Sequence, residues 1–83
     1  MSDWDIVDHK LVKEFVYKDF VEAVRFVNSI ADIAEARNHH PDIFLHSYNK
    51  VRVTLYTHSA KAITDNDYDL ALAIDNIGKH WYL

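Results

Sequence analysis

Residues 51–57 read VRVTLYT, a run in which apolar and polar side chains alternate. Alternation with a period of two, in a segment rich in β-branched and aromatic residues, predicts a β-strand with one buried face. One side of this strand, expected to face the core, carries Val51, Val53 and Leu55. The opposite side carries Arg52, Thr54, Tyr56 and, if the strand stays regular, His58. His58 is therefore predicted to point away from the core.

The strand 51–57 belongs to one of two predicted hairpins. Before it, the apolar residues 43–45 and the polar residues 47–50 predict a partner strand and a chain reversal. The start of the chain has the same organisation, because segments 4–7 and 11–17 are rich in β-branched and aromatic residues around a short polar break. A β-hairpin is expected at each place.

A helix is predicted between the two hairpins. Asp19 is a suitable N-cap, and Glu22 supplies the acidic half of a capping box. Apolar residues then recur at steps of three and four to form a stripe, namely Phe20, Val24, Val27, Ala31 and Ala34, widened by Ala23, Ile30 and Ile33. Asn38 can adopt the left-handed conformation that ends a helix, and Pro41 prevents its continuation.

A second helix is predicted after the strand 51–57. Thr64 is its N-cap, Asp67 stands at the third helical position, and Ile63 with Tyr68 can form a hydrophobic staple. Its apolar stripe consists of Leu70, Ile74, Ile77 and Trp81. The order ββαββα predicts an α+β two-layer sandwich, in which a four-stranded antiparallel sheet carries two helices on one face. The length favours a single domain over residues 1–83.

The composition, 49% hydrophobic and 27% charged, is typical of a globular chain that folds. A formal net charge of −4 argues against direct binding to nucleic acid, and no apolar run approaches the roughly 18 residues of a membrane span. The chain has no cysteine, which excludes disulfides and thiolate metal sites and fits a cytoplasmic location. So small a core predicts a thin margin of stability and favours association of subunits.

The chain has six histidines, each able to change charge near neutral pH. Glu35 lies one helical turn before His39, so its carboxylate can orient an imidazole, although histidines at a helix end also interact with exposed carbonyls without any function. His39, His40 and His58 could converge as acids and bases, or as metal ligands, but no His-x-His or His-x-x-x-His spacing favours a metal. The helix start is a sufficient structural role for Asp67. No role is assigned to His9, His46 and His80.

Several motifs occur together in one order. Residues 35–41 read EARNHHP, and YNKV at 48–51, LYTH at 55–58 and a Thr-x-x-Asp at 64–67 follow. With the flanking residues 15–20, this combination resembles the signature of the pterin-4a-carbinolamine dehydratase family. The resemblance implies a hydro-lyase that converts 4a-hydroxytetrahydropterin to quinonoid dihydropterin and water, and so recycles tetrahydrobiopterin. It implies no metal and no cofactor, because the pterin is the substrate.

The same resemblance implies roles for individual residues. His39 and His58 would share the acid and base steps, His40 would hold the pterin, and Glu35 and Asp67 would position or tune these histidines. The implied partners are the pterin carbinolamine and further copies of the chain, in a homodimer or homotetramer, with no direct nucleic acid and no membrane. The family is also similar to non-catalytic modules that act as a transcription-factor dimerisation cofactor or a Rubisco assembly factor, which leaves an interaction module as the alternative.

Overall fold

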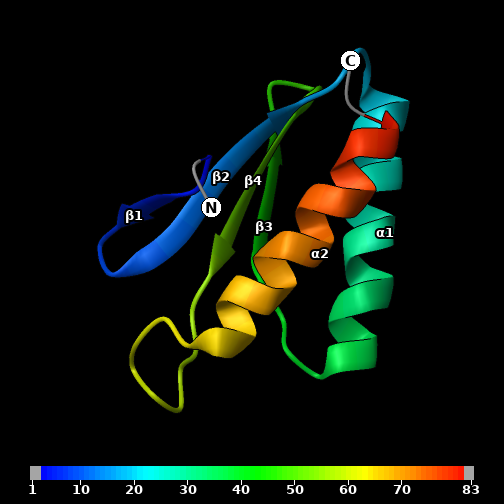
Figure 1. Ribbon diagram of the computed structural model, residues 1–83. Coiled ribbons are helices and arrows are strands. Elements are labelled where there is room, and N and C mark those ends of the chain that lie inside the picture. The colour runs from blue at the N-terminus through cyan, green and yellow to red at the C-terminus, as the bar shows by residue number, and fades with distance from the viewer. Residues whose placement is uncertain (1–2, 82–83) are drawn as a thin grey trace.

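The computed structural model describes residues 3–81, and their side chains as far as Gly78. In chain order the elements are β1 (Asp5–Val7), β2 (Lys10–Val16), α1 (Phe20–Arg37), β3 (Asp42–His46), β4 (Lys50–Leu55) and α2 (Asp65–Trp81). The strands form one antiparallel sheet of order β1-β2-β4-β3. Both helices cover the same face of this sheet and leave the other face open (Figure 1). The predicted α+β two-layer sandwich is therefore confirmed.

Both hairpin turns place residues other than glycine in the left-handed region. Asp8 and His9 connect β1 to β2 with φ of 51° and 66°, as a two-residue turn matched to the twist of the strands requires. Ser47 and Tyr48 begin the turn between β3 and β4 with φ of 51° and 58°. The two polar breaks in the sequence thus reverse the chain as predicted.

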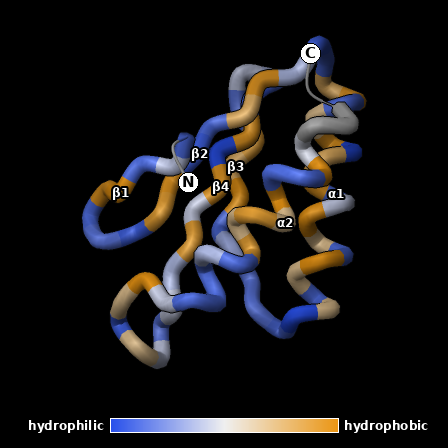
Figure 2. Tube along the Cα trace, viewed as in Figure 1, coloured by the Kyte–Doolittle hydropathy of each residue, from blue (hydrophilic) through white to orange (hydrophobic). Residues whose placement is uncertain are grey.

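The core lies between the sheet and the helices. Hydrophilic and hydrophobic residues alternate along the strands and helices, as Figure 2 shows, and the predicted inward side of β4 is fully buried. The core residues are Trp4, Leu11, Phe15, Tyr17, Ala23, Phe26, Ile30, Val51, Val53, Leu55, Leu70, Ala71 and Ile74. Ile77 is partly buried against them, in line with the predicted stripe of α2, whereas the side chain of Trp81 lies outside the described residues.

The predicted buried stripe of α1 is confirmed at Ala23, Ile30 and Ala34, which are buried, but it is wrong at Phe20 and it left out Phe26. Phe20, which was expected in the core, is 53% exposed, whereas Phe26, which the predicted stripe left out, is fully buried. The Phe26 ring packs 4.7 Å from the ring of Phe15 and 5.0 Å from the ring of Tyr17, measured between centroids. Apolar residues surround most of this helix, so the spacing alone does not decide whether Phe20 or Phe26 is the buried aromatic residue. The aromatic side chains on and after β2 decide between them.

Replacement of these two phenylalanines tests the corrected face. Phe26→Ala should lower the free energy of unfolding by about 3–5 kcal/mol, because it removes a ring from a packed core. Phe20→Ala, the matched control in the same helix, should change it by less than about 1 kcal/mol. Urea denaturation followed by circular dichroism measures both values. A larger loss in Phe20→Ala than in Phe26→Ala would contradict the burial of Phe26 in place of Phe20.

Candidate active site

Four segments meet at one end of the molecule: the end of α1, the start of β3, the segment after β4 and the start of α2 (Figure 1). Asn38 ends α1 in the left-handed conformation, with φ of 51° and ψ of 41°, as predicted. His39 and His40 therefore leave the helix directly opposite the first turn of α2. The fold therefore brings the His39-His40 pair and the Thr64-x-x-Asp67 motif together, although they lie far apart in the sequence.

His39 forms a close pair with Asp67 from the first turn of α2. The distance from His39 Nε2 to Asp67 Oδ1 is 2.6 Å, and the side chains of His39 and Asp67 are 16% and 0% exposed. An ionised carboxylate only accepts hydrogen bonds, so the Nε2 of His39 carries a proton and donates it. No described residue forms a hydrogen bond with Nδ1 of His39. Nδ1 is therefore the atom through which His39 can exchange a proton with a substrate.

The other oxygen of Asp67 is held by two further donors. Oδ2 accepts hydrogen bonds from Thr57 Oγ1 at 2.7 Å and from the main-chain N–H of Thr64 at 2.8 Å. Burial raises the pKa of Asp67, yet the hydrogen bonds from His39, Thr64 and Thr57 and the charge of His39 together hold this pKa below its ordinary value. The bond from Thr64 is the acidic half of the predicted capping box. Asp67 is thus ionised at neutral pH.

Glu35 contacts His40, whereas Asp67 contacts His39. The Oε2 of Glu35 is hydrogen-bonded to Nε2 of His40, and their side chains are 76% and 55% exposed. The left-handed turn at Asn38 directs His39 inward and leaves His40 above the last turn of α1. Glu35 therefore orients the second histidine of the pair, and water surrounds this contact, unlike the buried pair of His39 and Asp67.

His58 lies in the exposed turn that follows Thr57. Its ring is 5.2 Å from the ring of Tyr56 between centroids and stands edge-on to it. β4 ends at Leu55 and only an isolated bridge between Thr57 and Ala62 follows, so the strand alternation does not extend to His58. No described contact joins His58 to His39 or His40. Their convergence stays a prediction, supported by the bond that ties Thr57 to Asp67.

Sequence reasoning missed the contact between Thr57 and Asp67. The signal was present, because strand alternation places Thr57 on the same side as Val51, Val53 and Leu55. A hydroxyl on the core side of a strand needs a hydrogen-bond partner, and a carboxylate at the start of the next helix is a strong one.

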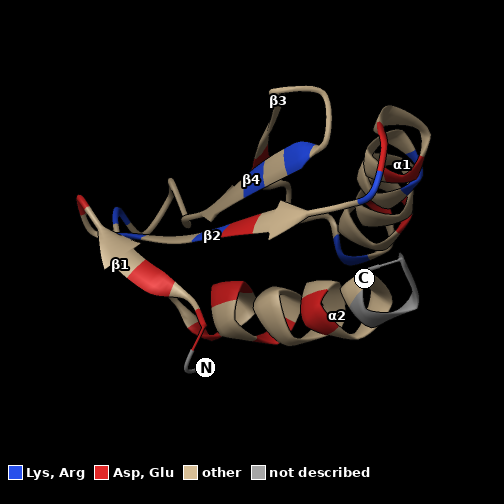
Figure 3. Ribbon diagram, turned by 90° about the horizontal axis from the view of Figure 1, so that it is seen from above, with Lys and Arg blue, Asp and Glu red and all other residues tan. Residues whose placement is uncertain are grey.

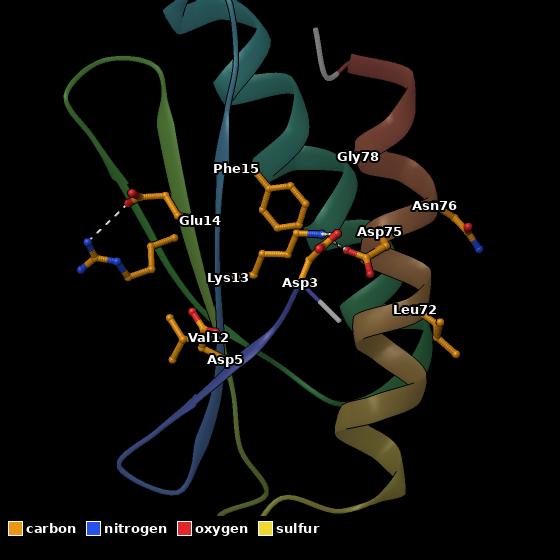
Figure 4. A pocket seen from close by; sticks show the side chains of 11 residues that line it. Asp3, Asp5, Val12, Lys13, Glu14, Phe15, Leu72, Asp75, Asn76 and Gly78 are labelled. Carbon is orange, nitrogen blue, oxygen red and sulfur yellow. Dashed lines mark hydrogen bonds and ion pairs between the residues drawn. The ribbon is translucent and has the colours of Figure 1, made fainter. Parts of the chain in front are cut away.

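A cleft of about 1000 Å³ lies elsewhere, between β2 and α2 (Figure 4). Lys13 and Asp75 point toward one another across it, with Nζ of Lys13 2.8 Å from Oδ1 of Asp75. The indole N–H of Trp4 also donates to Asp75, at 3.1 Å. None of the described residues that line this cleft is a histidine. The contacts of Asp75 with Lys13 and Trp4 hold β2 and the segment before β1 against α2.

Charged side chains are distributed unevenly over the elements whose side chains the structure describes, residues 3–78. Acidic side chains are spread along α2, and basic side chains are found on β4 (Figure 3). Within that range, no three His, Cys, Asp or Glu side chains are grouped so that they could hold a metal ion. Neither helix there is long and apolar enough to cross a membrane.

Fold and site together define a small α+β domain with paired histidines and carboxylates at the meeting point of its two helices. A family model described as Pterin 4 alpha carbinolamine dehydratase matches residues 1–77. The chain belongs to this family, as the motifs around His39 and His40 predicted.

Relatives from distant organisms agree with this assignment. A protein of a Picosynechococcus species named "Putative pterin-4-alpha-carbinolamine dehydratase" is 48% identical over 75 residues, which cover 90% of this chain and 80% of the relative. A protein of the same name from Sulfurisphaera tokodaii is 46% identical over 77 residues, which cover 93% of this chain and 82% of the relative.

Solved structures show the same fold. A "transcriptional coactivator/pterin dehydratase" from Brucella melitensis superposes with a TM-score of 0.87 at 36% identity, covering 94% of this chain and 84% of that one. A pterin dehydratase-like protein described as a RuBisCO assembly factor in the alpha-carboxysome has a TM-score of 0.73 at 18% identity, with 90% and 86% covered. The second likeness establishes the fold alone.

The charge of Asp67 should make stability depend on pH. Because its pKa is lower in the folded than in the unfolded chain, the ionised carboxylate stabilises the fold above about pH 4, and this contribution is lost as the pH falls through the folded pKa. Asp67→Asn should lower the free energy of unfolding at pH 7 by about 1–3 kcal/mol. The difference from the unmodified protein should shrink below about pH 4.

Urea denaturation between pH 7 and pH 3 measures this dependence. Asp69→Asn, at an exposed position in the same helix, is the matched control and should change the stability by less than about 0.5 kcal/mol throughout. A constant difference between the Asp67→Asn variant and the unmodified protein at every pH would contradict the lowered pKa of Asp67.

Proposed function

We propose that this chain is a 4a-hydroxytetrahydropterin dehydratase, a carbon–oxygen hydro-lyase that recycles tetrahydrobiopterin. The observation that carries the proposal is the buried pair of His39 and Asp67, which lies beside His40 in a chain of this family. A buried, ionised Asp67 fixes the ring of His39 and leaves Nδ1 available for proton transfer. The proposed substrate is the pterin carbinolamine itself, and the reaction needs no further cofactor.

The reaction removes water without oxidation or reduction. The bond from C4a to the hydroxyl oxygen breaks, its electron pair leaves with the oxygen, and an imidazolium supplies the proton that completes the water molecule. An imidazole removes the proton from N5, and the electrons of that N–H bond form the C4a=N5 double bond. We assign these two proton transfers to Nδ1 of His39 and to His58. His40, oriented by Glu35, holds the pterin by hydrogen bonding.

We further propose an oligomeric state and a location for the enzyme. An 83-residue chain with a small core has little stability to spare, so we propose that it works as a homodimer or homotetramer. The absence of cysteine fits a cytoplasmic protein.

Dehydration of chemically generated 4a-hydroxytetrahydropterin, followed by absorbance, tests the activity. The protein should accelerate the spontaneous reaction, and His39→Ala should lower the acceleration by about 10²–10⁴-fold, as expected for loss of a general acid or base. His46→Ala is the matched control, because His46 is bonded to Glu14 on the open face of the sheet and should leave the rate unchanged. A wild-type rate equal to the spontaneous rate would refute the proposal.

A non-catalytic interaction module is the second candidate. The description of the 36% identical structure from Brucella melitensis couples a coactivator role with pterin dehydratase. The two candidates differ in what they require of His58, which a proton carrier needs and a docking surface elsewhere does not. If His58→Ala abolishes dehydration but keeps full biological activity in the producing cell, the interaction role is favoured. Parallel loss of both favours the enzyme.

A further inference from the structure

The hydroxyl of Thr57 lies between two polar groups of the α2 start. Thr57 Oγ1 is 2.7 Å from Asp67 Oδ2 and 2.8 Å from Thr64 Oγ1. The opposite oxygen of the same carboxylate, Oδ1, contacts His39. Thr57 therefore touches the side of Asp67 that faces away from His39.

The protons in this network have only one arrangement. The ionised Asp67 can only accept, so the single hydroxyl proton of Thr57 is donated to Oδ2. The contact between the two threonine hydroxyls then requires that Thr64 donates and Thr57 accepts. The result is a directed chain from Thr64 through Thr57 to Asp67, in which each donor strengthens the next bond.

Main-chain hydrogen bonds hold Thr57 in place without its hydroxyl. Its N–H donates to the carbonyl of Ala62 at 3.1 Å, and its carbonyl accepts from the N–H of Ala60 at 3.2 Å and of Ala62 at 3.4 Å. A valine could keep these bonds and the β-branched shape. The hydroxyl is thus needed for Asp67 and not for the path of the chain.

We propose that Thr57 is a positioning residue of the dehydratase site, whose hydroxyl fixes the Asp67 carboxylate so that Oδ1 meets Nε2 of His39 and Nδ1 faces the substrate. This inference rests on the proposed function. Thr57 acts through Asp67 and does not touch the reacting atoms. It also precedes His58 in the chain, so both proposed proton carriers are held relative to one carboxylate.

The hydroxyl of Thr57 should also influence the pKa of Asp67 and so the pH dependence of the activity. Among the described residues, His39 is the titratable group that contacts Asp67, and the remaining contacts, from Thr57 and the Thr64 amide, are neutral donors. The hydrogen bond from Thr57 is one of those that lower the pKa of Asp67. Removing it should raise that pKa and move the acidic limb of the activity profile to higher pH.

Three variants test the inference in the dehydration assay. Thr57→Val should lower kcat about 10- to 100-fold through misplacement of the catalytic group, change KM by less than about threefold and shift the acidic limb upward. Thr57→Ser, which keeps the hydroxyl, should have a kcat within about threefold of the unmodified protein and the same pH profile. Thr54→Val, the same substitution on the open side of β4, should match the unmodified protein.

A measurement independent of turnover is the proton position on His39. Long-range ¹H–¹⁵N spectra of the histidine rings should show the Nε2–H form for His39 in the unmodified protein, and a mixture of both ring forms in Thr57→Val. If Thr57→Val does not fold by circular dichroism, Thr64→Val takes its place, because it removes the donor to Thr57 and should change the same quantities in the same direction.

The outcomes separate the two proposals. If the unmodified protein does not accelerate dehydration, the proposed function fails, and the ring spectra alone decide whether Thr57 positions His39. If the protein is active but Thr57→Val leaves kcat, the pH profile and the spectra unchanged, the inference about Thr57 is overturned while the dehydratase stands. A loss that Thr57→Ser does not restore also overturns it, because packing and not the hydroxyl would be responsible.

Discussion

The structure of the site depends on one buried charge, the carboxylate of Asp67. An unpaired carboxylate without exposure would destabilise a domain of this size beyond its whole margin of stability. Its three hydrogen-bond donors come from three separate segments: His39 after α1, Thr57 after β4 and the Thr64 amide at the start of α2. The need to satisfy one carboxylate therefore links all three segments, in addition to the shared core and the contact between Thr57 and Thr64.

This constraint divides the candidate site into two parts with different physical character. The pair of His39 and Asp67 is almost excluded from water, so its geometry is rigid and its charges act strongly on one another. The pair of His40 and Glu35 is largely exposed, so its attraction is screened and its side chains can adjust. The proposed dehydration, which transfers protons at a fixed point and also admits a bicyclic substrate, would use both properties. The rigid part suits proton transfer, and the adjustable part suits binding.

The sequence contains most of the fold but only part of the site. Capping residues and strand alternation place the elements, because they act over a few neighbouring residues and Asn38 or Thr64 can be recognised locally. The burial of Phe26 in place of Phe20 could not be predicted, because the aromatic partners of Phe26 lie on and after another element, β2. Spacing alone did not identify the partner of His39 for the same reason, and the resemblance implied Asp67 only as one of two carboxylates that position the histidines. Local spacing favours Glu35, whereas the bond to Asp67 spans 28 positions of sequence.

The same division explains how one fold can serve catalytic and non-catalytic proteins. Glu35, His40 and His58 are exposed, so their replacement would remove the proposed chemistry and leave the core unchanged. Replacement of Asp67 alone leaves buried donors without an acceptor and weakens the contact between α1, β4 and α2. A descendant of this fold can therefore lose its activity through the exposed residues at little cost in stability. Loss of the buried carboxylate requires compensating changes at His39 and Thr57 as well, so the network around Asp67 is a mark of the fold, and the exposed residues are the more informative mark of activity.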